Sequence, residues 1–321
     1  MTIPDKTPNG LHDKTVVVLY GALRSGTTLM RLILDAHPDI RCPGERDFML
    51  DFLQVDDGKV VLNAARLQEN RIFRDTGLDL PETTDGKAAF EMLLAQDCRI
   101  HDKPVHVLVL HRELDQLLSL IPDVRIIHMV RDPRDVARSS IGMGWAGNCW
   151  YGITHWIGTE RDWNEQTADL SKDQICEVQY EQLLRAPQET LERLCTFIGL
   201  PYSERMMDYS ATSTYEPLDP ALAEQWRHKL SPRELAEVEH KAGNLLLRSG
   251  YAPSVAAPRA PGVMRRIHLW VQNKRGVWKT RIARHGLIDP LLVATTRWTG
   301  LRRLSKRARA RIQENSKQYL K

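Results

Sequence analysis

The chain has 321 residues, of which 42% are apolar and 27% charged, and a formal net charge of +4 at pH 7. This composition is typical of a folded globular protein and excludes a fibrous or disordered chain. No stretch is apolar enough to span a membrane, and the polar first 14 residues lack the pattern of a secretory signal. We therefore expect a short tail over residues 1–14, followed by one α/β core with additions.

The cysteines are scattered along the chain without paired spacing, at Cys42, Cys98, Cys149, Cys176 and Cys195. Because a free cysteine is usually buried, each is expected to pack as a small apolar residue. Their odd number favours a reducing compartment over a disulfide framework, so the predicted location is cytoplasmic. The sequence has neither CxxC nor HExxH, and its motifs give no reason to expect a metal.

The first predicted strand is Thr15–Tyr20, a β-branched run that ends in glycine, as buried strands of parallel sheets do. A helix is expected over residues 27–36, because the residue before Pro38 is pushed out of the helical region. Residues 48–96 alternate charged and apolar residues between turn signals. This pattern predicts a helical insertion over the sheet, in a position that suits a substrate lid.

Three later segments continue the alternation of strands and helices. Residues 124–130 form a second apolar run, and Pro133 after it suits the first turn of a helix. Ile175–Gln179 is a third predicted strand, and Pro187–Ile198 is a predicted helix that Gly199 closes. This order indicates a central parallel sheet, so the expected fold class is a P-loop-type three-layer α/β/α domain over residues 15–253.

Charge is divided unequally along the chain. Residues 254–321 hold 17 lysines and arginines but only two acidic residues, whereas the rest of the chain is acidic overall. Residues 254–262, rich in proline and small residues, are expected to be a linker into this basic C-terminal extension. Residues 265–283 mix tryptophans and aliphatic residues with basic ones. They predict either a basic amphipathic helix, peripheral on an anionic membrane surface, or a helix docked on the core.

The segment after the first strand has the pattern of an anion site. Residues 21–28, GALRSGTT, show the glycine spacing of a phosphate-binding loop between a strand and a helix. Backbone N–H groups and the start of the helix would hold an anion there. An NTPase needs a lysine after the second glycine, but this position is Thr27, and the only cation in the loop is Arg24. The departure weakens a kinase interpretation and suits a phosphosulfate in place of a triphosphate.

Residues 24–42, RSGTTLMRLILDAHPDIRC, resemble the 5′-phosphosulfate loop of sulfotransferases that use 3′-phosphoadenosine-5′-phosphosulfate (PAPS). The similarity is greatest to the tyrosylprotein branch of that family. The resemblance places five residues at the phosphosulfate: Arg24, Ser25, Gly26, Thr27 and Thr28.

Two further motifs follow in the order of the same family. Residues 130–140, VRDPRDVARSS, resemble the site of the cofactor's 3′-phosphate, with Arg131 and Ser139 at the contacting positions. A guanidinium and a hydroxyl there would supply charge and directed hydrogen bonds. Residues 178–187, VQYEQLLRAP, resemble the segment that places a tyrosine beside the adenine, here Tyr180.

The resemblance, which covers residues 15–253, implies an enzyme that moves the sulfuryl group of PAPS to an acceptor hydroxyl on a protein tyrosine, a carbohydrate or a small molecule. In-line transfer needs cations at the leaving oxygens, and Arg24 and Lys103 fall at such positions by resemblance. Arginine and lysine can stabilise the leaving group, so no metal is required. Glu45 lies where the tyrosylprotein enzymes carry their catalytic base, although its neighbours depart from their pattern.

Other family positions have several candidates. Cytosolic relatives use a histidine base, so three histidines are alternatives to Glu45: His101, His111 and His128. A serine near the cofactor would be Ser210 or Ser213, and Trp226 is expected to be a packing residue.

Two other functions stay open. A nucleotide or small-molecule kinase built on the same loop would depend on ATP and Mg²⁺. A noncatalytic adaptor would bind an anionic partner, a membrane surface or a nucleic acid, through the basic extension. Nucleic acid is not the partner we expect for the enzyme, and a homodimer is left open.

Overall fold

The computed structural model describes residues 14–100, 102–299 and 311–312. The chain divides into two compact units. The first unit comprises Met1–Arg131 and Gly158–Ala223, and the second comprises Asp132–Ile157 and Glu224–Lys321. The predicted boundary at residue 254 therefore falls inside the second unit, which joins the basic extension to residues 132–157.

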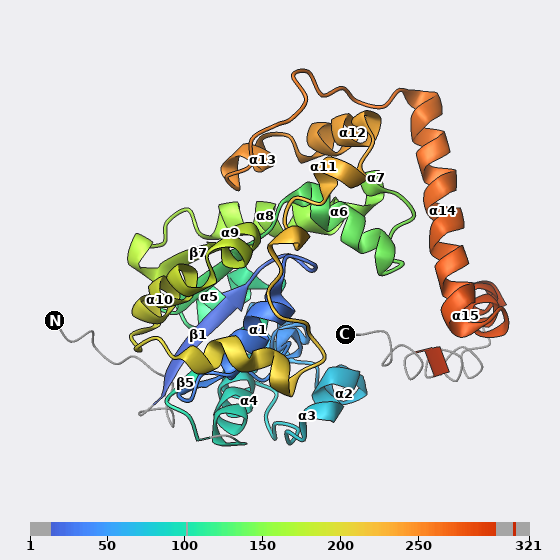
Figure 1. Cartoon of the computed structure of the whole chain (residues 1–321). Coiled ribbons are helices and arrows are strands. Elements are labelled where there is room, and N and C mark those ends of the chain that lie inside the picture. Colours follow the sequence, from blue (N-terminus) through green and yellow to red (C-terminus); the bar gives the residue numbers. More distant parts are fainter. Residues whose placement is uncertain (1–13, 101, 300–310, 313–321) are drawn as a thin grey trace. The chain divides into compact units, whose positions relative to one another are not determined.

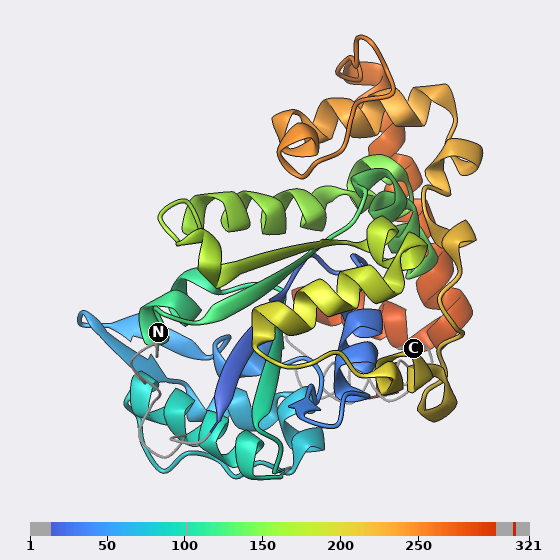
Figure 2. The ribbon, with the colours of Figure 1, turned by 60° about the vertical axis from the view of Figure 1, so that its left-hand side comes forward.

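The first unit is built on a five-stranded parallel sheet with the strand order β2-β5-β1-β6-β7. Its helices cover both faces of this sheet (Figures 1 and 2), which confirms the predicted three-layer α/β/α fold. The strands are β1 (Thr15–Tyr20), β2 (Ile40–Arg41), β5 (Val105–Leu110), β6 (Arg125–Val130) and β7 (Ile175–Gln179).

The central strand β1 is buried on both faces, because alternate side chains enter two different core clusters. Val16, Val18 and Tyr20 pack in one cluster, and Val17 and Leu19 pack in the other. A strand in this position needs apolar residues at successive positions, which is the pattern that predicted it.

The helices of the first unit are short and follow the strands. They are α1 (Thr27–Asp35), η1 (Asp47–Met49), α2 (Ala64–Glu69), α3 (Arg71–Thr76), α4 (Gly86–Ile100), α5 (Leu114–Leu120), η2 (Lys172–Gln174), α9 (Tyr180–Arg185), α10 (Pro187–Ile198), η3 (Glu204–Thr212) and η4 (Pro220–Leu222). Gly199 ends α10 in the left-handed conformation, with φ of 91°, as the sequence predicted.

The insertion between β2 and β5 begins with an antiparallel hairpin of β3 (Leu53–Asp56) and β4 (Lys59–Leu62). The turn of this hairpin is the predicted turn signal, where Asp57 and Gly58 both have positive φ. Helices α2, α3 and α4 form the remainder of the insertion. The segment therefore combines a hairpin with helices, whereas the sequence predicted helices alone.

The second unit is helical. Its helices are α6 (Pro133–Gly142), α7 (Cys149–Gly152), α11 (Trp226–Lys229), α12 (Pro232–Ala242), α13 (Asn244–Arg248), α14 (Val263–His285) and α15 (Ile288–Thr299), while α8 (Thr154–Gln166) starts in this unit and ends in the first. Arg134 is buried in this unit, where its guanidinium donates to Asp132 and Glu239. The same guanidinium lies 3.7 Å from the ring centroid of Trp226, so this tryptophan packs as expected.

Helix α14 docks on residues 142–148 of the same unit. The two segments approach so closely that a Cβ on Gly276 would lie 2.5 Å from the Cα of Gly147. Asn148 Nδ2 donates to Leu269 O at 2.7 Å, and the N–H of Gly147 donates to Asn273 Oδ1 at 2.7 Å. Because glycine has no Cβ, Gly147 and Gly276 allow the backbones of the two segments to come into contact.

All five cysteines are free and buried, as the sequence predicted. Burial raises the pKa of their thiols, that of Cys195 to about 11. Among the described helices, none is both long and apolar enough to cross a membrane.

Candidate active site

The predicted phosphate loop lies between β1 and α1 and needs glycine at two positions. A Cβ on Gly21 would lie 2.3 Å from the carbonyl oxygen of Met129. Gly26 has a φ of 96°, and a Cβ there would lie 2.4 Å from the ring of Tyr180. Between them, Arg24 takes the left-handed conformation with a φ of 72°, which is strained for a side chain of this size. The loop before α1 therefore has a tight backbone conformation that depends on these positive φ angles and close contacts.

A cavity of about 170 Å³ opens beside this loop. Six of the predicted cofactor residues line it: Arg24, Gly26, Thr27, Thr28, Arg131 and Tyr180. The guanidinium of Arg131 stacks on the Tyr180 ring at 4.1 Å and donates to Arg24 O at 3.2 Å. The parallel sheet explains this convergence, because the carboxyl ends of β1, β6 and β7 lie at one edge.

Two predicted cofactor residues do not line the cavity. Ser25 is fully buried in the loop, and its Oγ has no hydrogen-bond partner among the described residues. A buried hydroxyl is nearly always hydrogen-bonded, and a bound anion would accept a hydrogen bond from this one. Ser139 lies on α6 in the second unit, so its role at the 3′-phosphate stays a prediction.

A second wall of the cavity was not expected from the sequence. It comes from the segment after α10 and consists of Tyr209, Tyr215, Glu216, Pro217, Leu218, Asp219 and Leu222. The hydroxyl of Tyr209 donates to Glu216 O at 2.8 Å and ties this segment together. Ser210 and Ser213, the two expected serines, are not among the lining residues.

Lys103 does not reach the loop, which corrects its predicted role as a catalytic cation. It precedes β5, at the opposite end of the sheet from the loop, since Thr15 pairs with Val105 in the parallel register. Its ammonium donates to the carbonyl oxygens of Asp35, His37 and Ile40, at 3.3, 2.9 and 2.7 Å. Lys103 therefore stabilises the fold by donating hydrogen bonds to carbonyl oxygens at and just after the end of α1.

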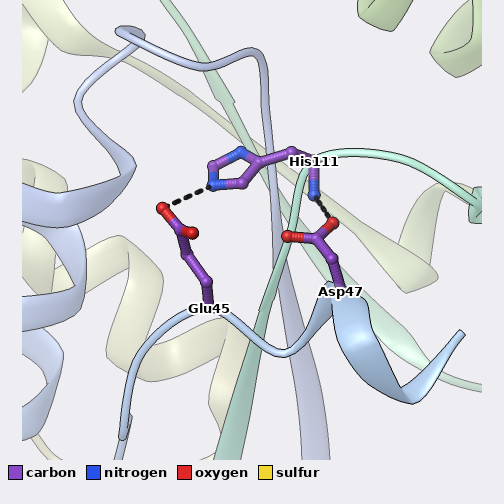
Figure 3. A group of neighbouring side chains, drawn as sticks. All are labelled: Glu45, Asp47 and His111. Atoms are coloured by element: carbon purple, nitrogen blue, oxygen red, sulfur yellow. Dashed lines mark hydrogen bonds and ion pairs between the residues drawn. The ribbon is translucent and has the colours of Figure 1, made fainter. Parts of the chain in front are cut away.

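Glu45, Asp47 and His111 form a cluster beside the loop, at the carboxyl end of β5 (Figure 3). The imidazole of His111 lies between two groups: its Nδ1 donates to Gly21 O at 2.7 Å, and its Nε2 lies 3.7 Å from the Glu45 carboxylate. The backbone N–H of His111 donates to Asp47 Oδ1 at 2.8 Å. His111 thus links the proposed base to the phosphate loop.

Within the cluster, Glu45 and His111 stabilise each other's charged form. The imidazole of His111, 3.7 Å away, lowers the pKa of Glu45 against the opposing effect of burial, so the carboxylate is ionised at neutral pH. Burial alone would lower the pKa of His111, but Glu45 and Asp47 outweigh it and raise the pKa above its usual value. The Glu45 side chain is 46% exposed and that of His111 only 4%, so Glu45 is the group that an acceptor can reach.

Arg112 is a cation that the sequence interpretation missed. It directly follows His111, and its guanidinium donates to both carboxylate oxygens of Asp51. Its charge also contributes to the low pKa of Glu45. The signal that could have found it is the strand before it, since polar residues that follow a parallel strand gather at the ligand-binding edge.

The other candidate bases differ in position. His101 lies outside the described residues. His128 is buried inside the core, where its ring nitrogens lie 3.5 Å from Glu160 and Glu177 and its ring stacks on Trp163. With an exposed fraction of 1%, His128 is a structural residue that no acceptor can reach.

A second cavity, of about 320 Å³, is lined by Glu45. Arg41, Gly44, Ile72 and Thr76 contribute to its walls. Arg46 and Asp97 also line it and make a buried two-point ion pair, with distances of 2.6 and 2.9 Å. Glu45 therefore borders this second cavity as well as contacting His111.

Comparison with known structures defines the class of fold. The chain is similar to the sulfotransferase domain of the olefin synthase of Synechococcus PCC 7002, with a TM-score of 0.54 and 20% identity. That alignment covers 72% of this chain and 96% of the domain. The fold is therefore that of a sulfotransferase domain.

The family follows from the sequence itself. The profile of the Sulfotransferase family matches residues 17–204, which is more than half of the chain and includes the loop, Glu45, Arg131 and Tyr180. The chain belongs to this family. The predicted enzyme class, a sulfotransferase, is thereby confirmed, and the membership supports PAPS as the cosubstrate.

Relatives of known name place the chain near one branch of the family. It is 27% identical over 212 residues to the protein-tyrosine sulfotransferase of Drosophila melanogaster, and 24% identical over 273 residues to protein-tyrosine sulfotransferase 2 of Gallus gallus. The matches cover 62% and 76% of this chain. They cover 40% of the fly protein and 71% of the chicken protein, so the chain spans less than half of the fly relative.

Proposed function

We propose that the chain binds PAPS in the cavity beside the loop and transfers its sulfuryl group to an acceptor hydroxyl at Glu45. The convergence of the loop, Arg131 and Tyr180 on one cavity carries this proposal. The buried Ser25 hydroxyl adds a donor that an anion in the loop would satisfy.

The chain offers a suitable binding group for each part of the proposed cofactor. Arg24 and the N–H groups at the start of α1 would hold the 5′-phosphosulfate, because a helix N-terminus favours an anion. Arg131 would hold the 3′-phosphate through a charge-assisted hydrogen bond, with Ser139 as the proposed second contact. Tyr180 would pack against the adenine.

The transfer itself needs one base and one cation. Glu45 would take the proton of the acceptor hydroxyl while its oxygen forms a bond to sulfur. The bond between sulfur and the bridging oxygen breaks, and the electron pair stays on the departing phosphate oxygen. Arg24 would stabilise the charge that develops there. The second cavity, beside Glu45, is the proposed entrance for the acceptor.

The acceptor we propose to test first is a peptide tyrosine, because the named relatives are protein-tyrosine sulfotransferases. Carbohydrate and small-molecule hydroxyls are the alternatives. Transfer without a metal remains a prediction. The ligand atoms of Glu45, Asp47 and His111 lie within 4.8 Å of one another, so a chelator control belongs in every assay.

Calorimetry with 3′-phosphoadenosine 5′-phosphate (PAP) and with ADP tests the cofactor. We expect PAP to bind more tightly than ADP, and Arg131→Ala to weaken PAP binding about 10- to 100-fold, as the loss of a charged hydrogen bond does. The exposed Arg74 on α3 provides a control, and Arg74→Ala should bind PAP normally. Equal or tighter binding of ADP would instead favour the kinase.

A further inference from the structure

Helix α14, labelled in Figure 1, has two unlike faces. One face docks on residues 142–148, and Leu269 in its middle is 1% exposed. The other face carries large apolar side chains with exposed fractions from 37% to 78%. We name these residues the apolar stripe: Val263, Met264, Ile267, Trp270, Val271 and Ile282.

The spacing of the apolar stripe follows the helical repeat. Positions three, four and seven residues apart lie on one side of a helix, and most of the stripe residues are related in this way. At 100° per residue, the stripe is opposite the docked face around Leu269 and Gly276. The packing of α14 within its unit therefore leaves these side chains uncovered.

Basic residues border the apolar stripe on both sides. Helix α14 contains seven lysines and arginines and no acidic residue. By helical spacing, Arg275 and Lys279 lie on one side of the stripe and Arg266 lies on the other. Lys274 and Arg281 lie within the angular range of the stripe itself. All five are exposed. Apolar and cationic groups are thus presented together on the uncovered face.

We propose that α14 lies in the plane of an anionic phospholipid surface. The apolar stripe would enter the boundary between head groups and acyl chains, where tryptophan is favoured, and the flanking cations would face lipid phosphates. A second copy of this chain fits the same face less well, because two α14 helices would bring like charges together. The proposal does not depend on sulfuryl transfer and stands or falls separately from it.

Co-sedimentation of the full chain with vesicles tests the proposal. We expect binding to vesicles of phosphatidylcholine with phosphatidylglycerol, and binding to phosphatidylcholine alone that is weaker by about tenfold or more. The double variant Ile267→Ser/Trp270→Ser should bind at least about tenfold more weakly, because the stripe supplies the apolar contact. Arg275→Gln/Lys279→Gln should lose about tenfold on anionic vesicles and become less sensitive to salt.

Val55 on β3 provides the matched control, since it is 77% exposed and lies in the first unit. Val55→Ser removes exposed apolar area elsewhere and should bind vesicles normally. Equal binding to neutral and anionic vesicles, or full binding by Ile267→Ser/Trp270→Ser, overturns the proposal. It is also overturned if light scattering shows a dimer that this double variant converts to a monomer, because the stripe would then be a surface for self-association.

Discussion

The two ends of the parallel sheet use cationic side chains in opposite ways. At the carboxyl ends of the strands, Arg24 and Arg131 line the cavity proposed to bind the cofactor. At the amino ends, Lys103 gives its ammonium protons to three backbone carbonyl oxygens. A cation in this chain is therefore available to a ligand only where the backbone around it leaves it beside a cavity, which the end of the sheet at which it lies determines.

The largest effect that would test this comparison is expected at Glu45. Glu45→Gln keeps the size of the side chain but removes the base, so kcat should fall about 10³-fold. Binding of PAP should persist, because Glu45 does not line that cavity. Single-turnover assays and calorimetry measure the two quantities. Glu82→Gln, at an exposed position, is the control, and unchanged turnover in Glu45→Gln would remove this residue from the mechanism.

His111→Gln should have a smaller effect, with kcat lowered about tenfold, because the variant keeps the base but loses its partner. The neighbouring imidazole of His111 holds the pKa of Glu45 below its usual value. Removing it raises that pKa, so the acidic limb of the pH–rate profile should move to higher pH. If His111 were itself the base, its loss would cost as much activity as the loss of Glu45, and the acidic limb would disappear.

Lys103→Met should affect stability and leave chemistry intact. The three carbonyl oxygens lose their donor, and the free energy of unfolding should fall by about 1–3 kcal/mol in urea titrations. The kcat of the folded enzyme should not change. Lys87→Met, at an exposed position on α4, controls for the loss of a lysine. A large drop in kcat at unchanged stability would return Lys103 to the site.

A last effect is expected in the pH dependence of stability, which the buried His128 should control. Burial opposes a charge on His128, but Glu160 and Glu177 outweigh it and raise the pKa to about 9. Because the folded pKa lies above the unfolded value, this stabilisation is complete below pH 6.5 and is lost as the pH rises through about 9. Urea titrations across this range should show the loss, and His128→Gln should show a flatter profile. Equal pH profiles in both proteins would contradict the assignment.

Local signals in the sequence were enough for the elements around the loop. The strands Thr15–Tyr20 and Ile175–Gln179 and the helix Pro187–Ile198 have the predicted bounds, because apolar runs, proline and glycine mark their ends. The loop was predicted from its glycine spacing between a strand and a helix, but the close approach of Met129 and Tyr180 to its glycines could not be read from the sequence.

The remainder depended on contacts between distant residues. Strand β5 was not predicted, and without it the sequence could not show that Lys103 and His111 lie at opposite ends of one strand. Tyr209 and Tyr215 belong to an irregular segment without periodicity, and only its packing brings them to the cavity. The division into two units likewise arises because the described residues from 224 to 299 pack with residues 132–157, which no local pattern records.

The buried cysteines allow local unfolding of each unit to be measured by alkylation. A thiol with a raised pKa inside the core reacts slowly with alkylating reagents until the structure around it opens. Cys149 belongs to the second unit, whereas Cys42, Cys98, Cys176 and Cys195 belong to the first. Mass spectrometry of alkylated peptides would therefore show, without any added probe, whether the two units open together or one after the other.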